Sequence, residues 1–186
     1  NKKVNVSKIS RPYGFAPTRS QLNHNSDNDL VLVWNETPTG VCIPDFDWIS
    51  TNRNGLVIVD GTSGVFGLSV DWEKIDVMTY SWQKILGGEA GNGMLILSPR
   101  AIKRLEDYTP DCPIPSIYQL KKNGKIKYSI FEGVTNNTYS ILSLEDYLMA
   151  LEWVNSIGPD NLQKKVIDNF KIVDDWINKT EWVDYF

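Results

Sequence analysis

Histidine and cysteine are scarce in this sequence of 186 residues. The one histidine, His24, stands in a polar run that we interpret as a solvated loop, and a Ser-His or Cys-His catalytic pair would have to use it. A single histidine also excludes a zinc site made of several histidines. The two cysteines, Cys42 and Cys112, lie far apart and match no metal-ligand spacing, with a disulfide as the less favoured alternative. We therefore expect neither a metal site nor histidine-dependent nucleophilic catalysis.

Long apolar runs and a surplus of positive charge are also missing. No apolar run approaches the roughly 20 residues of a membrane span, and no segment has the basic start and short apolar stretch of a signal peptide. The net charge of -4 and the pI near 5.0 leave no basic surplus to neutralise the phosphates of nucleic acid. We therefore expect a cytoplasmic globular protein that binds neither membranes nor nucleic acid. A small anionic ligand, which needs only local donors, is still compatible with this composition.

Six short apolar segments are predicted as strands, and they occupy residues 3–9, 29–34, 56–60, 76–81, 94–97 and 182–186. Helices are predicted at 44–51, at 100–107, from 143 to a Gly-Pro break at 158–159, and at 162–177. Apolar strands that alternate with helices predict an α/β fold, with a mostly parallel sheet flanked by helices. Because the first and last segments read as parts of larger elements, we expect the sequence to be part of a longer chain.

Two ionisable residues follow neighbouring predicted strands. Asp60 ends one strand, and Lys84 follows the next. In open α/β sheets ligands bind outside the carboxyl ends of the strands. We expect the flanking Trp82 and Ile85 to desolvate Lys84 partly, which favours the neutral amine that Schiff-base chemistry needs. This pair suits pyridoxal phosphate, whose ring nitrogen takes a carboxylate partner and whose carbonyl takes an amine. A surface lysine and a loop aspartate are the alternative interpretation.

The segments around these two residues carry a more specific pattern. Val-Asp-Gly-Thr-Ser occupies residues 59–63, and Ser-Trp-Gln-Lys-Ile-Leu-Gly-Gly occupies residues 81–88. Further matching segments lie at 34–41, 93–101, 104–110, 136–138 and 145–148. Together they resemble the phosphoserine aminotransferase family, which consists of class V, fold-type I enzymes that use pyridoxal phosphate. The resemblance is strongest from about residue 29 to residue 158, and it implies that the chain is part of the large domain of such an enzyme.

The resemblance implies pyridoxal 5'-phosphate as the cofactor and gives roles to four residues. Lys84 would form the Schiff base and then shuttle the substrate proton, and Asp60 would pair with the pyridinium nitrogen. Thr37 would donate to the phenolic oxygen of the ring, although it could also be a simple turn residue. Gln83 would bind the cofactor phosphate.

The same resemblance implies a partner subunit. Asn137 and Thr138 match the pair that reaches the phosphate of the cofactor bound to the neighbouring subunit. We therefore expect a homodimer with a shared active site. The alternative interpretation of this pair is a plain loop ahead of the following helix. Tyr139 departs from the family, which usually has proline at this position.

The implied reaction is transamination between glutamate and 3-phosphohydroxypyruvate, which gives phosphoserine and 2-oxoglutarate in serine biosynthesis. Another class V aminotransferase, of the alanine–glyoxylate or serine–pyruvate type, is an alternative. A cysteine desulfurase is disfavoured because Gln83 stands where those enzymes place a histidine. A third alternative is a truncated, catalytically incompetent fragment that only folds and dimerises.

The arginines bear on whether these 186 residues suffice for catalysis. None of them matches a substrate-binding arginine of the family, and Arg100 and Arg104 read as surface residues that pair with the acidic end of their own helix. We therefore expect the isolated chain to be inactive. Residues 1–178 are predicted to be the C-terminal portion of the large cofactor-binding domain, and residues 179–186 the start of a C-terminal small domain.

Overall fold

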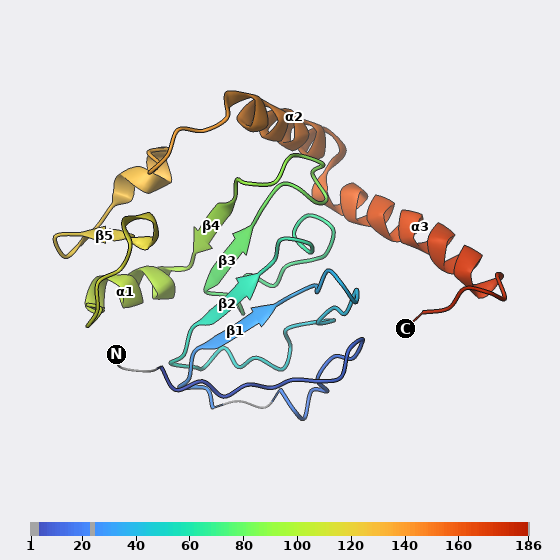
Figure 1. Ribbon diagram of the computed structural model, residues 1–186, viewed down its shortest axis with the longest axis horizontal. Helices are drawn as coiled ribbons and strands as arrows, with labels where there is room; N and C mark the ends of the chain where they lie inside the picture. The colour runs from blue at the N-terminus through green and yellow to red at the C-terminus, as the bar shows by residue number, and fades with distance from the viewer. Residues whose placement is uncertain (1–3, 23–24, 186) are drawn as a thin grey trace.

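A four-stranded sheet lies at the centre of the computed structural model, which describes residues 4–22 and 25–185 (Figure 1). Its strands lie in the order β1 (Leu30–Val33), β2 (Val57–Asp60), β3 (Val77–Tyr80) and β4 (Met94–Leu97). The first three strands are parallel, and β4 runs antiparallel to β3. Four of the six predicted strands and the prediction of a mostly parallel sheet are thereby confirmed.

The remaining elements follow the sheet in the sequence. They are α1 (Pro99–Asp107), the 3-10 helices η1 (Ser116–Tyr118) and η2 (Tyr128–Glu132), the hairpin strands β5 (Lys121–Lys122) and β6 (Lys125–Ile126), and the helices α2 (Ile141–Ile157) and α3 (Pro159–Asn178). Figure 1 shows α1 beside the lower end of β4, whereas α2 lies above the opposite end of the sheet. No helix within the described ranges has the length and apolar character needed to cross a membrane.

Side-chain caps and helix-breaking residues set the helix boundaries. The Ser98 hydroxyl accepts a hydrogen bond from the Ala101 N–H at 3.1 Å and so caps the start of α1. The helix α2 begins earlier than predicted, because Ser140 caps it by accepting from the Ser143 N–H at 3.3 Å. The predicted break between α2 and α3 is confirmed, since Gly158 has a φ of 85°, a conformation that glycine adopts without strain.

The hydrophobic core lies on one face of the sheet, where the segments between β1 and β3 cover it. The Trp34 and Phe46 rings lie 5.3 Å apart at its centre. The members of this core are Trp34, Phe46, Ile49, Val57, Val59, Val65, Ile75, Met78 and Tyr80. The other face of β1 is open, because Val31 and Val33 are 73% and 52% exposed. Strand β1 is therefore buried on one side only, because its alternate side chains point to a face that the described residues do not cover.

A helix predicted at residues 44–51 does not form. The Asp45 carboxylate accepts a hydrogen bond from the Asp47 N–H at 3.0 Å, and its backbone carbonyl accepts from the Trp48 indole N–H at 3.0 Å. Short polar side chains that bond to nearby backbone N–H groups favour turns over helices. The segment is therefore a series of turns and bends that places Phe46 and Ile49 in the core.

The two predicted terminal strands are also wrong where the structure describes them. Residues 4–9 and 182–185 form no strand, and Val4 and Val6 are 84% and 79% exposed. A strand requires a neighbour for its backbone hydrogen bonds, and neither segment has one in the described part of the chain. Residues 1–3 and 186, at the outer ends of these predictions, and His24 lie outside the described residues.

A buried ion pair ties the strands together at the end of the sheet where β2 and β3 begin. The Arg53 guanidinium donates to Asp76 at 2.9 Å, and both side chains are almost fully buried. Asp76 also accepts from the Val57 N–H and from the Ser98 hydroxyl, each at 2.9 Å. Burial alone would raise the pKa of Asp76, but these hydrogen bonds outweigh it and hold the pKa below its ordinary value. This network lies at the opposite end of β2 from Asp60.

The arginines of α1 reinforce the same end of the sheet. Arg100 donates to the carbonyls of Arg53 and Gly55 at 2.7 and 3.0 Å, and Arg104 donates to both oxygens of Asp29 at 3.2 Å. The prediction that these arginines pair with acidic residues of their own helix is therefore wrong. Among the described residues, no strand N–H donates to the carbonyls of Arg53 and Gly55, so these carbonyls are available to a helix that packs beside them.

Candidate active site

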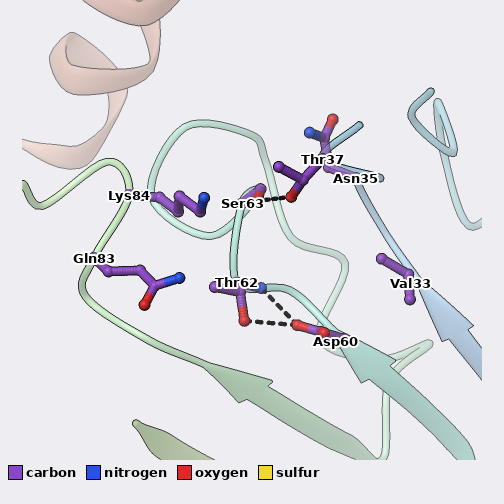
Figure 2. Close-up of a pocket in the computed structure, with 8 residues that line it drawn as sticks. All are labelled: Val33, Asn35, Thr37, Asp60, Thr62, Ser63, Gln83 and Lys84. Carbon is purple, nitrogen blue, oxygen red and sulfur yellow. Dashed lines mark hydrogen bonds between the residues drawn. The ribbon is translucent and has the colours of Figure 1, made fainter. Parts of the chain in front are cut away.

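A cavity of about 270 Å³ opens where the three parallel strands end. Polar side chains from the loops after β1, β2 and β3 line it (Figure 2). The lining residues are Val33, Asn35, Thr37, Asp60, Thr62, Ser63, Gln83 and Lys84. Carboxyl ends of adjacent parallel strands are the usual position of ligand sites in open α/β sheets.

Four of the six predicted site residues meet in this cavity. Gln83 and Lys84 reach in from one side, and Thr37 and Asp60 lie on the other, with Asp60 at the end of β2 (Figure 2). The other two, Asn137 and Thr138, are exposed in the loop before α2 and do not line the cavity. The cavity of one chain therefore contains Lys84, Asp60, Gln83 and Thr37, but not the loop that carries Asn137 and Thr138.

Asp60 is held by a residue two positions further along the chain. Its Oδ1 atom accepts hydrogen bonds from the Thr62 N–H at 3.0 Å and from the Thr62 hydroxyl at 2.7 Å. Its Oδ2 atom accepts none from the residues that the structure describes. One oxygen is thus fixed to the protein, and the other stays available to a ligand.

The turn after Asp60 is packed tightly into the core. Gly61 donates to the Thr79 carbonyl at 2.9 Å, which ties the turn to β3. A Cβ atom at Gly64 would lie 2.9 Å from the Trp34 ring, closer than real Cβ contacts, so only glycine fits there. The position of Thr62 and Ser63 therefore depends on close backbone packing.

Lys84 is exposed, which differs from the prediction that its neighbours shield it. The Trp82 side chain is buried against α2, and the Ile85 side chain packs beside Gly67, where an added Cβ would lie 2.9 Å from it. The prediction of desolvation by these two side chains is therefore wrong.

Helix α2 holds the segment that carries Lys84 through an aromatic stack. The Trp82 and Tyr147 rings are stacked with centroids 4.3 Å apart and an interplanar angle of 15°. The Tyr147 hydroxyl also forms a 2.9 Å hydrogen bond with that of Tyr80. Burial, and then this hydrogen bond, raises the pKa of Tyr80, so its hydroxyl stays neutral. The strand β3 and the residues that follow it are therefore fixed to α2 on both sides of Ser81.

A buried serine adds a polar contact to this stack. The Ser143 hydroxyl accepts from the Trp82 indole N–H at 3.3 Å and from the Asn92 amide at 2.9 Å. Ser143 is only 2% exposed, so both bonds are shielded from water. The two ends of the loop that contains Lys84 are thereby joined to one helical residue.

Thr37 lies in a turn that its own neighbours build. Glu36 accepts from the N–H and hydroxyl of Thr39, which closes the turn. The Thr37 hydroxyl lies 3.5 Å from that of Ser63, at the outer limit of a hydrogen bond. The hydroxyl is consequently free to turn toward a ligand in the cavity.

Sequence reasoning assigned no role to four of the lining residues, namely Val33, Asn35, Thr62 and Ser63. One signal could have found Thr62, because a Ser or Thr shortly after an aspartate in a turn commonly bonds to its side chain. The others follow only from the register of the sheet, which brings the ends of β1 and β2 together.

The lining residues fit pyridoxal phosphate by their chemistry. The cavity offers an amine for covalent attachment, a carboxylate with one free oxygen for a ring nitrogen, and neutral donors for oxygen atoms. No arginine of the described chain lines it, so it presents no bidentate partner for a substrate carboxylate. Across the described ranges, no group of histidine, cysteine or acidic side chains could hold a metal ion.

Comparison with known proteins identifies the family of this chain. The profile of the family "Aminotransferase class-V" matches residues 8–183. The phosphoserine aminotransferase of Methanosarcina barkeri is 45% identical over 174 residues, which cover 93% of this chain and 46% of that protein. The chain thus spans about half the length of the curated relatives it matches.

Solved structures share the fold. A phosphoserine aminotransferase from Cytophaga hutchinsonii has a TM-score of 0.71 at 23% identity, over 91% of this chain and 47% of that one. An alanine–glyoxylate aminotransferase from Nostoc sp. also has a TM-score of 0.71, at 21% identity, over 95% of this chain and 49% of that one. Since the family profile covers nearly the whole sequence, this chain belongs to the class V aminotransferase family.

Proposed function

We propose that this chain provides the cofactor-binding part of a pyridoxal-phosphate-dependent aminotransferase that acts on glutamate and 3-phosphohydroxypyruvate. The products would be 2-oxoglutarate and phosphoserine, a step of serine biosynthesis in the cytoplasm. The observation that carries the proposal is the meeting of Lys84 and Asp60 in one cavity at the ends of neighbouring parallel strands. The 45% identity to a phosphoserine aminotransferase supports the choice of substrates.

Lys84 is proposed as the residue that holds the cofactor and moves the proton. When bound, pyridoxal phosphate supplies an electron sink that stabilises negative charge on the substrate Cα. The Lys84 amine would bind the cofactor covalently and, once released, carry a proton from the substrate Cα to C4′ of the cofactor. An exposed side chain at the mouth of the cavity has the freedom to occupy both positions.

Asp60 is proposed to hold a proton on the ring nitrogen. Its Oδ2 atom accepts no hydrogen bond within the described chain, and Oδ1 is already bonded to Thr62. A carboxylate beside a pyridine nitrogen favours the protonated nitrogen, and the positive charge strengthens the electron withdrawal of the ring. Asp60 would therefore act through electrostatics, and the proton would stay on the ring nitrogen.

Two neutral side chains are proposed to orient the cofactor. Thr37, with its hydroxyl facing the cavity opposite Lys84, would donate to the phenolic oxygen, and Gln83 would donate its amide N–H to the phosphate. Asn35 and Ser63 also line the cavity and are additional candidates for polar contacts with the cofactor. Hydrogen bonds to two different groups of the cofactor would fix its orientation in the cavity.

Asn137 and Thr138 are proposed to serve the site of a second copy of the chain. Both residues are exposed and lie outside the cavity, so they do not contribute to it within one chain. A homodimer in which each loop reaches the partner's cofactor phosphate would account for this position. Under the same proposal, residues 1–178 belong to the large domain, and residues 179–186, which follow the end of α3, lead into a small domain.

A second candidate function has a specific observation in its favour. The fold matches an alanine–glyoxylate aminotransferase with the same TM-score, 0.71, as a phosphoserine aminotransferase. Substrate choice depends on groups that bind the side chain of the keto acid, and the described cavity contains no arginine for a phosphate. The higher sequence identity favours phosphoserine transamination.

The test is a direct comparison of keto acids with the protein made from its complete gene. Glutamate is supplied with 3-phosphohydroxypyruvate, glyoxylate or pyruvate, and the formation of 2-oxoglutarate is measured. The proposal predicts a kcat/KM at least about 100-fold higher for 3-phosphohydroxypyruvate, since charged recognition contributes roughly 3 kcal/mol. A preference for glyoxylate or pyruvate would favour the second candidate, and activity that survives Lys84→Ala would refute both.

A further inference from the structure

The contacts of Asp60 suggest a role for the residue that holds it. Thr62 donates twice to the same oxygen, Oδ1, once from its hydroxyl at 2.7 Å and once from its backbone N–H at 3.0 Å. Two donors on one oxygen restrict rotation of the carboxylate far more than a single donor does. The second oxygen, Oδ2, keeps its full capacity to accept, since no described residue donates to it.

Thr62 can impose this orientation because its own backbone is fixed. The Gly64 and Val65 N–H groups both donate to the Gly61 carbonyl, at 3.0 and 2.9 Å, which closes the turn around Thr62. The turn packs against the buried Trp34 ring at Gly64, where a side chain would not fit. The Thr62 hydroxyl is thus presented by a rigid segment, and Figure 2 shows it between Asp60 and Gln83.

Few other charges act on this carboxylate. Asp60 and Lys84 are the two charged side chains that line the cavity among the described residues. The remaining lining groups are hydroxyls, amides and one valine, which cannot replace a lost donor without moving. The orientation of Asp60 therefore depends on Thr62.

We infer that Thr62 is a positioning residue that turns Oδ2 of Asp60 toward the ring nitrogen of the cofactor. This inference rests on the proposed function, because it assumes that pyridoxal phosphate occupies the cavity. Without the hydroxyl, the carboxylate keeps only the backbone donor and rotates away from the line to the nitrogen. The nitrogen then holds its proton less firmly, and electron withdrawal by the ring weakens.

A structural role alone gives a different expectation. If Thr62 merely closed the turn, its replacement would lower the melting temperature and leave the protonation of the bound cofactor unchanged. Protonation of the ring nitrogen is read directly by nitrogen-15 NMR of a labelled cofactor, without any measurement of turnover. This readout separates the two roles.

The experiment compares Thr62→Val, which removes only the hydroxyl at nearly constant volume, with Thr62→Ser, which keeps it. The cofactor-loaded protein made from its complete gene is titrated with pH. We expect the apparent pKa of the ring nitrogen to fall by about one unit in Thr62→Val, equivalent to a tenfold weaker affinity for the proton, and to stay at the wild-type value in Thr62→Ser. Thr51→Val is the control, since Thr51 is exposed and does not line the cavity.

Two outcomes would overturn the inference. One is an unchanged titration in Thr62→Val, and the other is a shift that Thr62→Ser shares. Thr62→Ala replaces the valine variant if that protein does not fold. Asp60→Asn tests the underlying function in the same series: if it leaves the nitrogen unaffected, Asp60 is not the partner of the ring and the proposed site itself is wrong. If the pKa of the ring nitrogen shifts in Asp60→Asn but not in Thr62→Val, the inference about Thr62 is wrong and the proposed role of Asp60 stands.

Discussion

Trp82 lies stacked on Tyr147, with ring centroids 4.3 Å apart, although the two residues belong to a loop at the sheet and to a separate helix. Trp82 is buried and precedes Lys84 by two positions. The stack therefore fixes the backbone of the predicted cofactor lysine while its side chain stays exposed. A rigid backbone under a mobile amine is what a residue needs if it both holds a cofactor and transfers a proton.

Truncation of Tyr147 should loosen this attachment. Tyr147→Phe keeps the stack and removes only the hydrogen bond to Tyr80, so we expect a loss of about 1–3 kcal/mol in the free energy of unfolding and normal cofactor binding. Tyr147→Ala removes the ring, which should cost about 3–5 kcal/mol and weaken cofactor affinity. Urea denaturation and cofactor titration measure the two effects. Wild-type affinity in a folded Tyr147→Ala protein would contradict the proposed link to Lys84.

The buried pair of Arg53 and Asp76 predicts how stability depends on pH. The pKa of Asp76 is lowered in the folded state, so the pair contributes fully above the ordinary aspartate value of about 3.9 and is lost as the pH falls through the lower folded value. Asp76→Asn should therefore be less stable by about 3–5 kcal/mol near neutral pH and lose less stability on acidification below about pH 4.

Thermal melts between acidic and neutral pH check this expectation. Asp107→Asn serves as the control, because Asp107 pairs with Lys103 at the surface and water already screens that pair. If Asp76→Asn and Asp107→Asn showed the same stability and the same dependence on pH, the buried pair would not be the link that closes this end of the sheet.

Periodicity and turn chemistry predicted most of the sheet and the helices. The strand that ends at Asp60 was predicted correctly because an apolar run fills it, with Gly55 before it and Gly61 after it. The strand before Lys84 was predicted at residues 76–81 and is found at Val77–Tyr80. The helix predicted at residues 44–51 failed because Asp45 bonds to its own neighbours, a local competition that periodicity does not report. The terminal strands failed because a strand depends on a partner that no pattern in the segment itself reveals.

The candidate site was predictable to a similar degree. Asp60 and Lys84 were singled out because each follows a predicted strand, and the family resemblance then gave them roles. Parallel strands bring the two residues together. The partners of Arg100 and Arg104 were not predictable, because they are backbone carbonyls and an aspartate brought near only by the fold. The exposure of Lys84 was not predictable either, since it depends on the direction in which its two apolar neighbours pack.

Complementation between two inactive variants tests the shared site. Lys84→Ala would inactivate the chain's own cavity, and a chain with both Asn137→Ala and Thr138→Ala would impair the cavity of its partner. A heterodimer of the two variants has one intact site. Each heterodimer should therefore have up to about half of the activity of a wild-type dimer. Mixtures that regain no activity, despite proof of subunit exchange, would contradict the proposed dimer.

The 186-residue chain on its own should turn over slowly. Arg53, Arg100 and Arg104 are engaged with Asp76, backbone carbonyls and Asp29, and no arginine of the described chain lines the cavity. Without a group that fixes the substrate carboxylate, the barrier loses a contribution of several kcal/mol, up to about 7–11. An assay of this polypeptide with cofactor, glutamate and 3-phosphohydroxypyruvate should therefore detect far less than about one turnover per second. Turnover near that rate would show that the substrate is held by other residues of the cavity.

The most direct measurement is the chemical identification of the lysine that binds the cofactor. The cofactor-loaded protein is treated with borohydride, which reduces the bond between the cofactor carbonyl carbon and the lysine nitrogen to a stable amine. Proteolysis and mass spectrometry then locate the added mass. We predict that it lies on Lys84 in the peptide that contains Trp82 and Gln83, and that Lys84→Ala carries none. Stoichiometric modification of another lysine, or of the Lys84→Ala protein, would contradict the central claim.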